Sequence, residues 1–196
     1  MITIGGRNDL ALEVVNSMHE FRHEIFVRRL GWSLPLIDGV ERDEFDNEDA
    51  VYFIVRDLNE CICGCARLLP TTGPYLLSEL FGDLLGDQPA PCDPQVWELS
   101  RFAASVRKTG EGRVLSLSQP TLDLLEAVIS FAQQRAAKRL ALVTTVPIER
   151  LLLRAGFDVH RIAAPAQVRD CLCVALFIEL PPAAAAVGLD HCWTNQ

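Results

Sequence analysis

The chain has 196 residues, of which 49% are hydrophobic and 22% charged, a composition typical of a globular protein large enough to form one well-packed domain. Its formal net charge of −8 argues against general nucleic-acid binding, and no uncharged apolar run approaches the length of a membrane span, about 18 residues. The N-terminal residues show no basic segment followed by an apolar stretch, so we expect no secretory signal and a cytoplasmic location.

A helix and a long loop are expected at the start of the chain. Asn8 or Asp9 is a candidate cap for a helix that runs to about Arg29, because apolar residues recur in this segment at helical spacing. Residues 31–49 have no regular period and are rich in Pro, Gly and acidic residues. Aromatic and aliphatic side chains are interspersed among them, which favours an ordered loop, and a loop of this length is usually functional.

Three strands are expected in the middle of the chain, at residues 50–57, 61–69 and 97–105. The first two are joined by Leu58-Asn59-Glu60, which is a hairpin signal. Residues 70–95, which separate the second strand from the third, are predicted to be irregular with a short helix near 77–85.

The second half of the chain is predicted to alternate helices and strands. A helix is expected from Pro120 to Arg139, with Ser118 or Gln119 as its cap. The remaining elements are expected to be a strand at 140–146, a helix at 147–156 closed by Gly156, and strands near Val159 and at 171–180.

The order of these elements predicts one α/β domain over residues 1–180, with a central mixed sheet flanked by helices. Near the C-terminus, a helix followed by Arg154-Ala155-Gly156-Phe157 and a strand resembles the N-acetyltransferase-like (GNAT-like) fold. Residues 181–196 carry little pattern, and we expect them to form a tail that is partly mobile.

The seven cysteines indicate structural thiols and no metal site. Cys61, Cys63 and Cys65 alternate, as do Cys171 and Cys173, and this period of two places such side chains on one face of a strand. That geometry is poor for a zinc knuckle, and the four histidines are scattered along the chain. We therefore predict buried, reduced cysteines.

The predicted strand at 97–105 contains charged side chains in an apolar run. Glu98 and Arg101 lie among aromatic and aliphatic residues, and a charge in a core strand costs free energy unless a partner compensates it. Regular alternation would place Glu98 and Ser100 on one face and Arg101 on the other. If all three line one site, the strand must bulge near Ser100.

A set of nine residues extends this charged group over the first half of the chain: Arg22, Phe26, Trp32, Asp43, Asp46, Arg67, Glu98, Ser100 and Arg101. Taken singly, the acidic run 41–46 is also compatible with a solvated loop, and each arginine with a surface position. Together, in this order and spacing, the set resembles the signature of acyl-homoserine-lactone synthases, the bacterial quorum-sensing autoinducer synthases. Residues 144–161 resemble a strand–helix–strand segment of the same family, so the resemblance covers about residues 20–180.

The resemblance implies an enzyme that joins S-adenosylmethionine to the acyl group of an acyl-[acyl carrier protein], with no cofactor or metal. The amine of the methionine attacks the thioester, and the carboxylate then displaces 5′-methylthioadenosine to close the lactone. Glu98, Ser100 and Arg101 would be catalytic, with Glu98 either the base or a structural partner of Arg101. The residues expected to bind S-adenosylmethionine are Arg22, Phe26, Trp32, Asp43, Asp46 and Arg67, although the charged ones among them also suit a network that shapes the pocket.

Two further surfaces follow from the resemblance. The acyl pocket is expected to be lined by Phe81, Phe102, Val143, Thr144 and Thr145. A threonine on this strand is associated in the family with 3-oxo acyl groups, but Thr144 and Thr145 compete for that position. The acidic carrier protein is expected to meet a basic surface made of Arg107, Lys108, Arg135, Lys138, Arg139 and Arg150.

Two alternative functions are compatible with parts of the sequence. The run Arg107-Lys108-Thr109-Gly110-Glu111-Gly112 fits the phosphate loop of coenzyme A-dependent N-acetyltransferases, which makes an acyl-CoA-dependent N-acetyltransferase the second hypothesis. In that class the loop runs directly into a helix, whereas here residues 113–118 lie between the loop and the predicted helix with its cap. A catalytically silent, ligand-binding relative is the third hypothesis, and the intact charged set argues against it.

Overall fold

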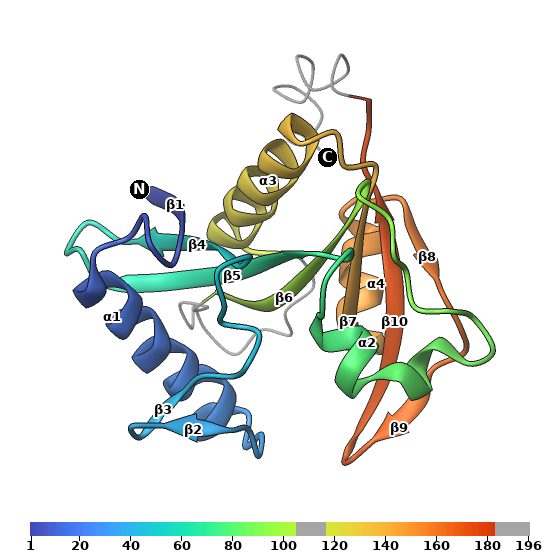
Figure 1. Cartoon of the computed structure of the whole chain (residues 1–196), viewed down its shortest axis with the longest axis horizontal. Helices are drawn as coiled ribbons and strands as arrows, with labels where there is room; N and C mark the ends of the chain where they lie inside the picture. The colour runs from blue at the N-terminus through green and yellow to red at the C-terminus, as the bar shows by residue number, and fades with distance from the viewer. Residues whose placement is uncertain (105–116, 183–196) are drawn as a thin grey trace.

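The computed structural model of the chain describes residues 1–104 and 117–182, and it is built on one large mixed sheet (Figure 1). The strands of this sheet are β1 (Ile2–Gly6), β4 (Val51–Arg56), β5 (Ile62–Pro70), β6 (Val96–Ala104), β7 (Arg139–Thr145), β8 (Val159–Arg161), β9 (Ala166–Val168) and β10 (Cys171–Glu179). Their order is β1-β4-β5-β6-β7-β10-β8, with β9 paired to β10. A separate hairpin joins β2 (Leu36–Ile37) to β3 (Val40–Glu41). The predicted α/β architecture is confirmed.

The sheet divides between β6 and β7. These two strands run parallel and pair only over Val96–Glu98 and Arg139–Ala141 in the described part of the chain, whereas the other strand pairs are antiparallel. Beyond Glu98 the strands diverge, which leaves backbone groups of β6 without partners on β7. The divergence separates a half made of β1, β4, β5 and β6 from a half made of β7, β10, β8 and β9.

Helices cover both faces of the sheet, and each face has its own apolar core. On one face, here called the α1 face, lie α1 (Leu12–Arg22), the π-helix η1 (His23–Arg29), α2 (Leu76–Leu80) and the 3-10 helix η2 (Gly82–Leu85). On the opposite α3 face lie α3 (Gln119–Gln134) and α4 (Val146–Arg154). Figure 1 shows α1 below the β4–β5 half and α4 beside β10.

The N-terminal segment differs from the sequence prediction. Residues 2–6 form an edge strand that the two glycines of this short segment had concealed. The carboxylate of Asp9 accepts a hydrogen bond from the backbone N–H of Gly6, 2.9 Å away, and so stabilises the turn after β1 instead of capping a helix. The helix begins at Leu12, and after Arg22 it continues to Arg29 as a π-helix.

The helix predicted to reach Arg139 ends five residues earlier, at Gln134. Ala136 adopts a left-handed backbone with φ of 59°, which turns the chain out of the helix. The N–H of Lys138 then donates to the carbonyl of Gln95, at 2.7 Å, and brings Arg139 into β7 beside β6.

The bulge predicted in β6 is confirmed. Cys65 pairs with Ala103 and Arg67 with Ser100, so Ala66 alone faces both Arg101 and Phe102. Arg101 has a left-handed backbone with φ of 51°, as the extra residue of a bulge often does. The bulge breaks the alternation, because Ser100 and Arg101 both face the α1 side while Phe102 packs in the α3-face core.

The cysteines are free in the described part of the chain, but burial was predicted correctly only for Cys65 and Cys173. Cys61, Cys92 and Cys171 are exposed, so their predicted burial is wrong. Cys63 does not share the face of Cys65, because the β4–β5 register shifts between Val55 and Arg56 and Cys63 turns toward the α3-face core. The seventh cysteine, Cys192, and the predicted tail from 183 onward lie outside the described residues.

Candidate active site

Six buried charged side chains meet on the α1 face. Arg22, at the end of α1, donates to Glu41 and forms a bidentate pair with Asp46 at 2.7 and 3.0 Å. Arg67 of β5 donates to Asp43 at 2.5 and 3.2 Å and to Asp46 at 3.0 Å. Arg101, on the β6 bulge, donates to Glu41 at 3.0 Å and to Asp43 at 2.6 Å. We call these six residues, Arg22, Glu41, Asp43, Asp46, Arg67 and Arg101, the charge network.

The charge network balances its own charge. Three guanidiniums face three carboxylates, and each residue is at most 8% exposed. Burial alone would raise the pKa of Asp46, but Arg22 and Arg67 together hold that pKa well below its usual range. Burial alone would lower the pKa of Arg22, but the charges of Asp46 and Glu41 raise it. Arg22, Asp46 and Arg67 therefore stay ionised, and the guanidiniums of Arg22 and Arg67 are paired within the network.

The charge network joins elements that are distant in the sequence. It ties the end of α1, the loop after β3, and strands β5 and β6 to one another. Local bonds hold its loop in place, because Asp46 accepts the N–H of Asp43 and Asp43 accepts the N–H of Phe45. Tyr52 of β4 donates its hydroxyl to Asp46 at 3.1 Å. The long loop predicted to be ordered is held by these contacts.

Glu41 is a member of the charge network that the sequence-based set omitted. It is fully buried and links Arg22 to Arg101, while its backbone carbonyl lies 3.0 Å from Nδ1 of His19. The acidic run 41–46 contained the available signal, because Glu41 and Asp43 are two residues apart and so share a face in an extended chain.

An aromatic pair borders the charge network. Phe26 of η1 is buried and stacks on Trp32, with ring centroids 5.2 Å apart and an angle of 22° between the rings. The guanidinium of Arg101 lies 6.0 Å from the centre of the Phe26 ring. Trp32 is 38% exposed, so part of its ring surface is open to a ligand. The structure thus brings Phe26, Trp32 and Arg101 together.

Glu98 lies next to the charge network, at the last position where β6 pairs with β7. Its carboxylate accepts the backbone N–H groups of Leu77 and Leu76, at 2.6 and 3.1 Å, at the start of α2. Burial raises the pKa of Glu98, and the N–H of Leu77 and the charge of Arg67 oppose that rise. Ser100, two residues on, accepts a hydrogen bond from Nε of Arg67 at 3.1 Å. Glu98 therefore both anchors α2 and lies where the strands separate.

The predicted acyl-pocket residues are split between the two faces. Val143 packs against the α1-face core, and Thr145 shares that face because it pairs with Cys173. Thr144 points to the α3 face because it pairs with Val174 of the α3-face core, and the bulge directs Phe102 there as well. Phe81 packs on the α1 face. The five predicted acyl-pocket residues therefore do not lie on one face of the sheet, and their role in an acyl pocket stays a prediction.

Four residues of the predicted carrier-protein surface lie in the described part of the chain, and they come from different elements. Arg135, Lys138 and Arg139 lie near the start of β7, and Arg139 pairs with Glu179 at 2.8 Å. Arg150 lies on α4, after the far end of β7, which as a seven-residue strand is about 20 Å long. Arg107 and Lys108, together with the predicted phosphate loop, lie outside the described residues.

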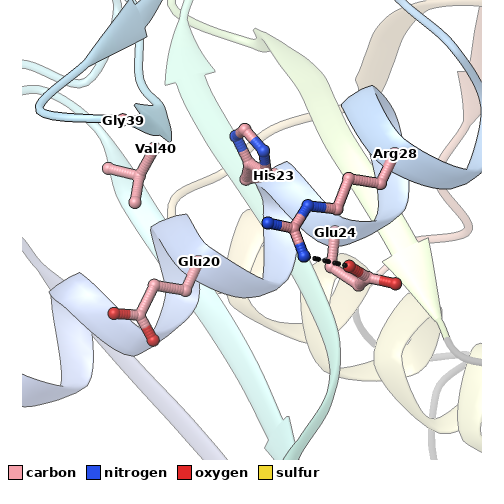
Figure 2. Close-up of a pocket in the computed structure, with 6 residues that line it drawn as sticks. All are labelled: Glu20, His23, Glu24, Arg28, Gly39 and Val40. Carbon is pink, nitrogen blue, oxygen red and sulfur yellow. Dashed lines mark ion pairs between the residues drawn. The ribbon is translucent and has the colours of Figure 1, made fainter.

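A hollow of about 240 Å³ is lined by residues of α1, η1 and the β2–β3 hairpin. Figure 2 shows its six lining residues: Glu20, His23, Glu24, Arg28, Gly39 and Val40. None of these residues belongs to the predicted site or to the charge network, so the hollow is not the candidate site. Over residues 1–104 and 117–182, no group of three His, Cys, Asp or Glu residues is arranged to hold a metal, and no helix is long and apolar enough to cross a membrane.

Comparison with known proteins shows the family to which the chain belongs. The profile described as "Autoinducer synthase" matches residues 8–185. An acyl-homoserine-lactone synthase of Ralstonia nicotianae is 42% identical over 190 residues, which cover 94% of this chain and 91% of the relative. One from Acinetobacter nosocomialis is 38% identical over 182 residues, covering 91% and 99%.

Solved structures agree with this result. The AHL synthase LasI superimposes with a TM-score of 0.84 at 35% identity, covering 96% of this chain and 94% of LasI. TofI in a ternary complex with an inhibitor and MTA gives 0.80 at 38% identity, covering 97% of each chain. The CoA-dependent synthase BjaI, solved with SAM and isopentyl-CoA, gives 0.80 at 29% identity, covering 92% and 83%. A putative N-acetyltransferase of Lactobacillus plantarum, with a TM-score of 0.59 at 17% identity, shares the fold alone.

Proposed function

The chain belongs to the autoinducer synthase family and is an acyl-homoserine-lactone synthase, and we propose that it makes the lactone from S-adenosylmethionine and an acyl-[acyl carrier protein]. One observation carries the proposal. The bulge at Arg101 turns Ser100 and Arg101 toward the α1 face, beside Glu98 and the Phe26–Trp32 pair, where β6 and β7 diverge. A donor and an acceptor substrate would meet at this divergence.

In the proposed site, S-adenosylmethionine lies against Trp32 and the edge of the charge network. The partly open Trp32 ring suits the sulfonium or the adenine. Asp43 and Arg101, at 6% and 8% exposure, retain slight access to solvent, so they are the members proposed to contact the amine and the carboxylate. Arg22, Asp46 and Arg67 are enclosed by their mutual bonds and are proposed to hold the other residues in position.

The acyl chain is proposed to lie between β6 and β7 against Val143, Thr145 and Phe81. Its thioester carbonyl would then face the edge of β6 that has no partner on β7. Backbone N–H groups on such an edge stabilise the oxyanion that forms when a thioester is attacked.

The first chemical step is amide formation. The methionine nitrogen attacks the thioester carbon, a C–N bond forms, the C–S bond breaks, and the carrier protein leaves as its thiol. The amine must lose a proton to become nucleophilic, and Glu98 is proposed to accept it directly or through one water. Burial raises the pKa of Glu98, which makes its carboxylate a stronger base than an exposed one. Each of its oxygens keeps a lone pair beyond the backbone hydrogen bond it accepts.

The second step closes the ring. The methionine carboxylate attacks Cγ, the bond from Cγ to the sulfonium breaks, and its electron pair stays on sulfur as 5′-methylthioadenosine leaves. The sulfonium is a good leaving group, so this step depends chiefly on holding the carboxylate in line. The complexes of TofI with MTA and of BjaI with SAM support this choice of substrate.

A test of the proposed function compares acyl donors. The purified chain is incubated with S-adenosylmethionine and either acyl-carrier protein or the matching acyl-CoA, and acyl-homoserine lactone and 5′-methylthioadenosine are followed by mass spectrometry. We expect both products with the carrier-protein donor. Turnover with acyl-CoA alone would favour the second candidate donor, to which the similarity with CoA-dependent BjaI points.

A further inference from the structure

The segment that carries Trp32 is fixed on its inner side. This segment, residues 30–35, links η1 to β2 and is here called the Trp32 segment. The N–H of Trp32 donates to the carbonyl of Phe26 at 2.9 Å, and the two rings stack. Gly31 precedes Trp32 with a left-handed φ of 69°, so the chain turns sharply before the aromatic ring. These contacts tie the segment to η1.

A residue from the other end of the chain holds the same segment from outside. Nη1 of Arg169 donates to the backbone carbonyl of Ser33, which directly follows Trp32, at 3.0 Å. Arg169 lies in the tight turn between β9 and β10. Leu34, Ala166 and Val168 all pack against the α1-face core, so apolar contacts accompany the hydrogen bond on both sides.

This contact connects the β7–β10 half of the sheet to the Trp32 segment on the other side of the divergence. Cys173 of β10 pairs with Thr145, the last residue of β7, and the β9–β10 turn lies beyond that pair. The turn is therefore at the end where β6 and β7 have diverged. In Figure 1, β9 and the β2–β3 hairpin lie at the same lower end of the molecule, on the two sides of this divergence. The Arg169–Ser33 bond connects them there.

The backbone conformation of Arg169 indicates that its side chain has a role. Its φ is 52°, in the left-handed region that glycine and asparagine adopt more readily than arginine. Nε2 of Gln167 donates to the carbonyl of Arg169 at 2.8 Å and steadies this turn. A glycine would form the turn with less strain, so the turn alone does not explain the arginine.

From these contacts we propose that Arg169 is a positioning residue, which holds the Trp32 segment against Phe26 across the divergence and so strengthens the binding of S-adenosylmethionine. The inference rests on the proposed function, because it takes Trp32 as part of the S-adenosylmethionine site. Arg169 touches neither the charge network nor Glu98 in the structure, so it acts on binding and leaves the chemical step unchanged.

Three variants test this role. Arg169→Gly removes the guanidinium and relieves the left-handed backbone, so the turn itself is not weakened. Arg169→Lys keeps a cation and one donor. Ser33→Ala is the matched control, because the bond uses the backbone carbonyl of Ser33 and not its hydroxyl. The dissociation constant of S-adenosylmethionine is measured by calorimetry without an acyl donor, and kcat is measured with both substrates saturating.

We expect Arg169→Gly to weaken the binding of S-adenosylmethionine about three- to tenfold, the range of one exposed, charge-assisted hydrogen bond. kcat and Tm should stay at their wild-type values, Arg169→Lys should fall between the wild type and the glycine variant, and Ser33→Ala should bind as the wild type does. Wild-type affinity in Arg169→Gly would overturn the inference, as would a large fall in its Tm. If the wild-type chain itself bound no S-adenosylmethionine, the proposed function would fail instead.

Discussion

The two faces of the sheet are both buried under helices, but they are packed with different kinds of side chain. The α3-face core is built from aliphatic and aromatic residues of β4, β5, β6, β7, β10, α3 and α4, and the buried Glu149 beside it pairs with Arg161. The α1 face buries three arginines, three carboxylates and Glu98 in addition to its apolar core. Both faces belong to one sheet, so the strands do not dictate the difference.

The comparison indicates that the charges serve the site and not the fold. Removing ion pairs from water costs several kcal/mol per ion, and apolar residues of similar volume often replace a buried charge network without loss of stability. The α3 face shows that this sheet packs well without such a network. We infer that the charge network is retained because it fixes Arg101, Ser100 and Phe26 in one arrangement, whereas the α3 face needs only to exclude water.

The largest expected effect comes from removing one charge of the network. Arg67 and Leu68 are neighbours on β5, both fully buried, and they point to opposite faces. Arg67→Met leaves Asp43 and Asp46 short of a partner, so the free energy of unfolding should fall by about 3–5 kcal/mol. Leu68→Met, the matched control, should cost less than about 1.5 kcal/mol.

Urea unfolding of both variants provides the measurement. A loss in Arg67→Met no larger than that in Leu68→Met would show that the two faces are energetically alike, and the comparison would fail.

Glu98→Gln should affect the chemical step and, to a smaller extent, the fold. A glutamine cannot take the proton of the amine, so turnover should fall by about 10²–10⁴-fold. Its amide NH₂ also cannot accept a hydrogen bond from Leu76 or Leu77, so stability should fall by about 1–3 kcal/mol. Glu79→Gln, on the exposed side of α2, is the control and should change neither quantity.

Steady-state kinetics at a temperature where both variants remain folded separate the two effects. Near-normal turnover in Glu98→Gln would remove Glu98 from the chemistry and leave it only the role of holding α2.

The smallest expected effect is a pH dependence of the protein's stability, which comes from His19 on the α1 face. Burial lowers the pKa of His19, and Arg22 lowers it further, so the folded protein resists protonation of this ring. In the unfolded chain this ring takes up a proton near pH 6.5. The contribution of His19 to the free energy of unfolding is therefore fully present above pH 6.5 and is lost as the pH falls below it. The loss is at most about 1.4 kcal/mol per pH unit.

Denaturant unfolding between pH 7 and 5 measures this slope. His19→Gln should flatten it. Glu98, whose pKa is raised by burial, contributes a slope of opposite sign, but this contribution cancels in the difference between wild type and variant. Equal slopes in wild type and His19→Gln would contradict the assignment.

The sequence predicted the features that rest on local pattern. The strand containing Glu98 and Arg101, the need for a bulge near Ser100, and the α/β architecture all follow from alternation and element order. The nine-residue set converges on the α1 face, where its members contact one another or lie next to one another.

What the sequence did not predict depends on register and on distant partners. The predicted face of Cys63 was wrong because this residue lies at a shift in strand register, and period-two counting fails at such a shift. Glu41 was missed because only the fold shows that it bridges Arg22 and Arg101. The end of α3 was misplaced because the backbone bond from Lys138 to Gln95 overrides the helix preference of the residues before it.

The central claim is that the α1 face holds the site where an acyl-carrier thioester meets S-adenosylmethionine. The most direct measurement is a quantitative mass balance with purified chain, acyl-carrier protein and S-adenosylmethionine. The account predicts that acyl-homoserine lactone and 5′-methylthioadenosine appear in equal amounts, with one free carrier thiol for each. Consumption of the thioester without lactone, or lactone formed from acyl-CoA but not from the carrier protein, would contradict it.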